Sequence, residues 1–114
     1  MNNKTKKDLF ERQFHYWIVK LELDKKYKFD LKQDNRMNSY ASIEVNGKNS
    51  YEVRYNTKRL SGQYKIIHTL LHEIGHTFYD FRIKDDIMHE AGAEHFALST
   101  IKKEMPKIYK QCIR

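Results

Sequence analysis

The chain has 114 residues, of which 39% are hydrophobic and 32% charged, and it contains a single cysteine. These values predict one domain over residues 1–114 and exclude a scaffold held by internal disulfides. No apolar run approaches the ~18 residues that span a bilayer, so we expect a soluble, cytoplasmic protein without membrane contact. The formal net charge of +7 would suit an acidic partner such as DNA, but the lysines and arginines are spread along the chain, which is typical of a solvated surface.

Hydrophobic periodicity predicts a helix followed by strands in the first half of the chain. Apolar residues recur at helical spacing over 5–21, and this stripe is the first candidate for the core. Apolar and charged residues then alternate over 27–31, as in a strand with one buried face. An Asn-Gly pair, which is a strong turn signal, separates two further alternating segments, so strands over 40–46 and 50–56 are predicted to form a β-hairpin.

The second half of the chain predicts two helices. Apolar positions at spacings of one, three and four mark a strongly buried helix from Tyr64 to near Tyr79. A short charged loop over 80–86 follows, and Asp86 can cap a third helix. That helix should end before Pro106, whose ring disfavours helical geometry at the preceding residue. The fold class expected is therefore α+β: an N-terminal helix, a small and mostly antiparallel sheet with a hairpin, then two packed helices.

One motif in the first of these two helices carries metal chemistry. His72-Glu73-Ile74-Gly75-His76 matches H-E-x-x-H. Residues four apart share a helix face, so two imidazoles can each point a nitrogen at one zinc ion. The glutamate beside the first histidine can then act as the general base that takes a proton from a zinc-bound water. A pair of buried, hydrogen-bonded histidines is the plainer alternative.

A catalytic zinc needs a third protein ligand and an open position. A histidine six residues beyond His76 would be the metzincin arrangement, but position 82 is arginine, which excludes that class. Glu90 is the best candidate, because a short loop and a reversed helix could return it to the metal. The alternative for Glu90 is an exposed acid at a helix start. His89 and His95, in the predicted third helix, are further candidates for the third ligand.

The motif HEIGH, followed by Glu90-Ala91-Gly92-Ala93-Glu94-His95-Phe96-Ala97, resembles the zincin-like ImmA/IrrE metallopeptidases of gluzincin type. The resemblance covers about residues 50–106. It implies that Glu90 is the third zinc ligand and that Glu94, where the family usually has Asp or Asn, supports a zinc-bound histidine. It also implies an intracellular endopeptidase whose substrate is a regulatory protein, typically a helix-turn-helix transcriptional repressor. His89 and His95 remain candidate donors to the transition-state oxyanion.

Other functions stay open at this point. A SprT-like, DNA-associated peptidase would suit the basic charge, but the third histidine usual in that class is missing. A stand-alone minigluzincin would suit the size, and its N-terminal segment could cover the cleft. A non-catalytic zinc-binding module would need a fourth protein ligand, from His89 or His95. For a peptidase, an extended substrate could add to an edge strand of the sheet, and our hypothesis is that residues 50–56 form this edge.

Overall fold

A computed structural model describes residues 1–79 and 86–112, without the side chains of Asp86 and Cys112. Residues 80–85 of the loop predicted over 80–86, and the capping role predicted for the Asp86 side chain, therefore lie outside the described residues. In chain order the elements are helix α1, Asn3–Lys20; the 3-10 turn η1, Leu23–Lys25; strands β1, Lys28–Gln33, β2, Ala41–Val45, and β3, Ser50–Tyr55; and helices α2, Gln63–His76, α3, Asp86–Glu104, and α4, Pro106–Cys112.

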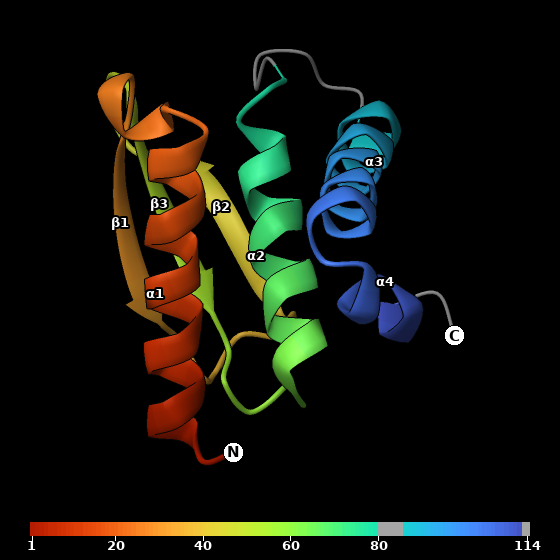
Figure 1. The fold of residues 1–114 in the computed structure, drawn as a ribbon. Coiled ribbons are helices and arrows are strands. Elements are labelled where there is room, and N and C mark those ends of the chain that lie inside the picture. The colour runs from red at the N-terminus through yellow and green to blue at the C-terminus, as the bar shows by residue number, and fades with distance from the viewer. Residues whose placement is uncertain (80–85, 113–114) are drawn as a thin grey trace.

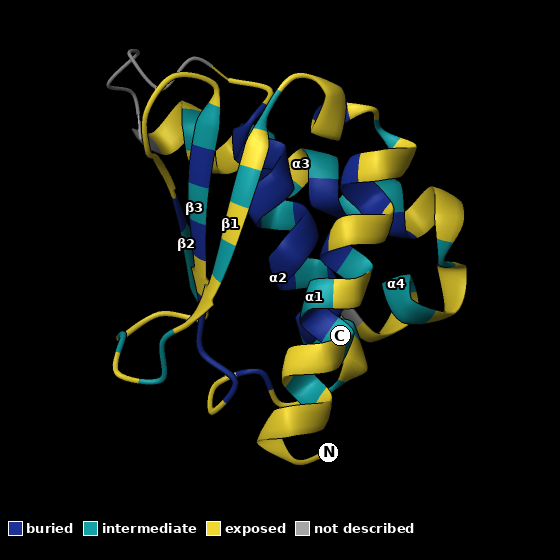
Figure 2. Ribbon diagram, turned by 90° about the vertical axis from the view of Figure 1, so that its left-hand side faces the viewer, coloured by how far each residue is buried: buried dark blue, intermediate teal, exposed yellow. Residues whose placement is uncertain are grey.

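The three strands form a mixed sheet in the order β1-β3-β2. β3 pairs in parallel with β1 and antiparallel with β2, the latter through the predicted hairpin. Gly47 occupies the turn of that hairpin at a φ of 92°, a left-handed conformation that glycine adopts without steric cost. The helices lie on one face of the sheet, with α1 and α2 side by side and α3 against α2 (Figure 1; Figure 2).

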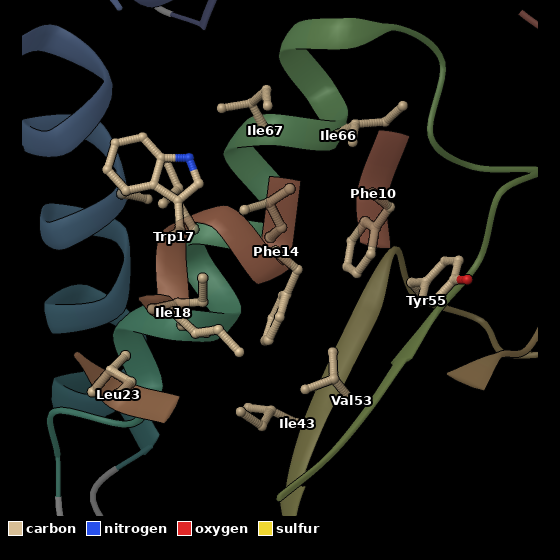
Figure 3. Packing of buried hydrophobic residues seen from close by; sticks show 14 of the residues in the cluster. Phe10, Phe14, Trp17, Ile18, Leu23, Ile43, Val53, Tyr55, Ile66 and Ile67 are labelled. Carbon is tan, nitrogen blue, oxygen red and sulfur yellow. The ribbon is translucent and has the colours of Figure 1, made fainter. Parts of the chain in front are cut away.

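The core lies between the sheet and the pair of helices α1 and α2 (Figure 3). The side chains of Phe10 and Phe14 in α1 are fully buried, and the ring of Phe10 stacks on that of Tyr55 at a centroid distance of 4.3 Å. Val53, in the central strand, is also fully buried. Because the stripe predicted over 5–21 fills this space, α1 is a structural helix.

Helices α2 and α3 approach each other closely at Gly75. A Cβ atom built on Gly75 would lie 2.9 Å from both the Cα and the carbonyl oxygen of Ala93, which are backbone atoms that cannot give way easily. Ala93, Ala97 and Ile101, spaced four residues apart on α3, are fully buried along this contact. A glycine inside the H-E-x-x-H motif thus sets how near α3 lies to the two histidines.

The predicted α+β fold class is confirmed, with differences of detail. The sheet contains one parallel and one antiparallel pairing. Residues 50–56 correspond to the central strand, so the hypothesis that they form an edge was wrong. The edge beside α2 is β2. The third helix ends at Glu104, before Pro106 as predicted, and the proline then starts α4, at the first helical position, where its missing N–H costs nothing. Within the described residues no helix is both long and apolar enough to cross a membrane.

Candidate metal centre

A cleft of about 900 Å³ runs along the outward side of α2. Its walls are residues 39–43 at the start of β2, one face of α2, and the first turns of α3. α2 buries its isoleucines and leucines in the core and turns the remaining face toward this cleft, which is the consequence of its helical period. His72, Glu73 and His76 belong to that face and line the cleft.

His72, His76 and Glu90 converge in the cleft. The Nε2 atom of His72 lies 2.8 Å from Oε2 of Glu90, and the Nε2 atom of His76 lies 3.1 Å from Oε1 of the same carboxylate. One ligand atom from each of the three residues lies within 4.8 Å of the others, so the group could hold a metal ion. Atoms that bind zinc tetrahedrally at 2.0–2.1 Å lie about 3.3 Å apart, which is close to the 2.8 and 3.1 Å contacts between the two imidazoles and the Glu90 carboxylate.

Each histidine uses its other ring nitrogen for a contact away from this convergence point. Nδ1 of His72 lies 3.3 Å from Oε1 of Glu94, and Nδ1 of His76 lies 2.9 Å from Nδ1 of His89. Metal-binding histidines commonly hold their rings through such outer contacts, which fix the tautomer and leave Nε2 for the metal. Glu94 therefore lies beside His72, and the supporting role suggested for it stays a prediction.

His68 contacts Glu94, a partner that the sequence alone did not predict. This residue lies one turn before His72 on α2, and its Nε2 atom is 2.6 Å from the same Glu94 oxygen that contacts His72. Burial opposes the charge of Glu94, but the hydrogen bond from His68 and the two nearby histidines outweigh it, so the pKa of Glu94 is lowered. The i, i+4 spacing of His68 and His72 was the available signal, because it places both rings on one helix face.

Glu73 lies in a much drier environment than Glu90. Its side chain is only 7% exposed, and this burial raises its pKa from 4.5 to about 7, with His72 opposing and the charge of Glu90 reinforcing the shift. Burial likewise lowers the pKa of His76, with Glu90 opposing the shift, which favours the neutral imidazole that a metal requires. A carboxyl group with a pKa near neutrality can exchange protons at physiological pH.

The other two candidate histidines lie in different places. His89 lines the cleft behind His76, with the two rings stacked at a centroid distance of 5.2 Å. His95 is exposed on α3, with its Nε2 atom 3.5 Å from Oγ of Ser99, and does not line the cleft. Their suggested roles as oxyanion donors stay predictions. The described residues of α1 do not line the cleft either, so an N-terminal cover over it is not observed.

No protein-family model, curated protein or solved structure matches this chain. Any function must therefore be inferred from the residues themselves. They comprise two imidazoles and one carboxylate that could hold a metal ion, a buried carboxyl group beside them, and a cleft that leads to them.

Proposed function

We propose that this protein is a zinc-dependent endopeptidase that cleaves an intracellular regulatory protein. One observation carries the proposal: the Nε2 atoms of His72 and His76 meet at the Glu90 carboxylate, while both Nδ1 atoms have outer partners. Placing two partly desolvated imidazoles beside one carboxylate costs free energy unless a ligand satisfies them. A divalent cation is the ligand that satisfies all three groups.

Zinc is the metal that best suits this donor set. Two imidazole nitrogens and one carboxylate oxygen form the ligand type of hydrolytic zinc sites, which keep a further position open. Among the described residues the converging group contains these three ligands and no fourth, which favours a catalytic over a purely structural site. When bound here, zinc would supply a water of lowered pKa and polarise the scissile carbonyl.

Glu73 carries the proton transfers in this proposal. It lines the cleft next to His72 and its pKa is close to 7, so it can take a proton from the attacking water. The water oxygen bonds to the scissile carbon, and Glu73 then passes the proton to the nitrogen that departs as the C–N bond breaks. Glu94 and His89 act by holding the two histidine rings in place.

The cleft also offers a place for an extended substrate. One side of β2 pairs with β3, and residues 41–43 of β2 line the cleft. A peptide that adds to this strand would run past the histidines, so the edge proposed for substrate is β2. The resemblance to ImmA/IrrE peptidases suggests a helix-turn-helix repressor as substrate and a cytoplasmic location. The net charge of +7 keeps a SprT-like association with DNA as the alternative.

Zinc stoichiometry and cleavage test the proposal together. The purified chain should bind one zinc ion, and the zinc-loaded protein should cut unstructured protein substrates. Glu73→Gln should keep the zinc and lose cleavage, whereas His72→Ala should lose both. His15→Ala, which changes an exposed histidine of α1 outside the cleft, is the matched control and should alter neither. Full zinc binding with no difference between the wild type and Glu73→Gln on any substrate would support a non-catalytic zinc module.

A further inference from the structure

The cleft continues well beyond the three candidate ligands. Lys65, His72 and His76 lie on the face of α2 that lines it, and Lys65 marks the end remote from His76. Seven residues of α-helix separate Lys65 from His72, which corresponds to a rise of about 10 Å. An extended peptide advances about 3.3 Å per residue. A substrate passing through the cleft would therefore meet Lys65 about three residues from its scissile bond.

Lys65 is held against an aromatic ring at this end of the cleft. Its Nζ atom lies 4.0 Å from the ring centroid of Tyr40, close enough for a cation–π interaction. The backbone before β2 that carries Tyr40 is itself fixed by Asn56, which is 2% exposed. The Asn56 N–H donates to the carbonyl of Tyr40, and the Asn56 side-chain amide donates to the carbonyl of Met37, both at 2.9 Å.

The charge of Lys65 has no acidic partner within the described residues. Some lysines elsewhere on the surface have one, for example Lys32, which lies 2.8 Å from Glu52, and Lys20, which lies 3.4 Å from Glu104. Among the described residues that line the cleft, Lys65 is the only lysine or arginine, and the acids lie near the histidines. The ring of Tyr40 covers one side of the ammonium group, whose remaining N–H donors are left for a ligand.

We propose that Lys65 and Tyr40 form a substrate subsite that selects an acidic side chain, Asp or Glu, about three residues from the scissile bond. This inference rests on the proposed peptidase function and specifies its substrate class. A carboxylate from the substrate accepts hydrogen bonds from the Lys65 ammonium group, while Tyr40 keeps that group in place. Because Lys65 is half-buried and Tyr40 is exposed, the preference is modest: about fivefold for an acid over its amide, and smaller at high salt.

Binding and cleavage can be measured separately. Zinc-loaded Glu73→Gln protein is incubated with a pooled library of short unstructured peptides, and the captured peptides are identified by mass spectrometry. Peptides with Asp or Glu should be enriched about fivefold over their Asn or Gln counterparts. Lys65→Gln in the same background should abolish the enrichment, and Lys65→Glu should reverse it in favour of Lys and Arg. In the wild type, the acid should lie about three residues from the cut.

Lys102→Gln is the matched control, because Lys102 also lies over a tyrosine ring, 5.7 Å from the centroid of Tyr109, but outside the cleft. It should leave the preference unchanged. Equal capture of acid and amide peptides, or a preference that survives Lys65→Gln, would overturn the subsite. Selective capture without cleavage by the wild type would instead contradict the peptidase function and leave the acid-binding site standing.

Discussion

The raised pKa of Glu73 has a measurable consequence in the metal-free protein. The carboxyl group keeps its proton up to about pH 7 in the folded chain, against an ordinary value of 4.5. Between these two values the folded state binds more protons than the unfolded state, so stability falls as pH rises through this window. A difference of about 2.5 pH units corresponds to roughly 3 kcal/mol of unfolding free energy, all of it lost above pH 7.

Glu73→Gln removes this titration while keeping the shape of the side chain. In metal-free protein the variant should match the wild type near pH 4, where both side chains are neutral. At pH 8 it should be more stable than the wild type by up to about 3 kcal/mol. Urea denaturation followed by circular dichroism, with a chelator present, measures this difference at each pH, and comparing the two proteins cancels the contributions of other groups.

Glu44→Gln provides the control, because Glu44 is exposed on β2. Its stability relative to the wild type should hardly vary with pH. If Glu73→Gln shows no gain at pH 8, or the same gain at pH 4 and pH 8, then Glu73 is hydrated in solution and does not hold its proton to neutral pH. A general base tuned by burial would then no longer be supported.

Three further predictions test the site and its packing. Zinc at a hundredfold excess over its dissociation constant should stabilise the chain by about 2.7 kcal/mol, raising the Tm by roughly 10 °C in differential scanning calorimetry, and Glu90→Ala should reduce this shift at the same zinc concentration. His68→Leu should weaken zinc binding about tenfold, because Glu94 loses its short hydrogen bond; competition with a chromophoric chelator measures the affinity. His68→Gln keeps an N–H donor and should recover part of the affinity. Unchanged affinity in His68→Leu would contradict this role of His68. Gly75→Ala should lower the free energy of unfolding, measured by urea denaturation, by about 1–3 kcal/mol and should weaken zinc binding, since the added methyl meets the α3 backbone. Gly62→Ala is the control: its methyl meets nothing within 4 Å, so the loss of stability should be smaller.

Local patterns accounted for most of what the sequence could predict. The helix that carries His72 and His76 follows from apolar spacing, and the hairpin follows from the Asn-Gly turn, because both signals lie within a few residues of the elements they specify. Glu90 came from spacing and from a family resemblance, and the structure brings it within 3.1 Å of both imidazoles. These three residues could therefore be grouped before the fold was known.

Non-local pairing accounted for most of what the sequence could not predict. Strand β1 pairs in parallel with β3, which places β3 in the centre of the sheet, and no residue within 50–56 signals that neighbour. Lys65 and Tyr40 are 25 positions apart in sequence and meet only because β2 lies beside α2. His68 and Glu94 likewise meet across the α2–α3 contact, whose closeness depends on Gly75.

The residues that contact the Nδ1 atoms of His72 and His76 differ in charge, and this difference predicts which contact supports metal binding more strongly. With a metal on both Nε2 atoms, each Nδ1 carries the proton and donates it outward. His72 then donates to a carboxylate, Glu94, which also accepts from His68. His76 donates to Nδ1 of His89, which can accept only while His89 is neutral and protonated on Nε2. Since a charged acceptor strengthens the hydrogen bond and the basicity of the ligand, Glu94 would contribute more than His89 to holding a metal at this site. The additional hydrogen bond from His68 therefore acts on the stronger of the two supports.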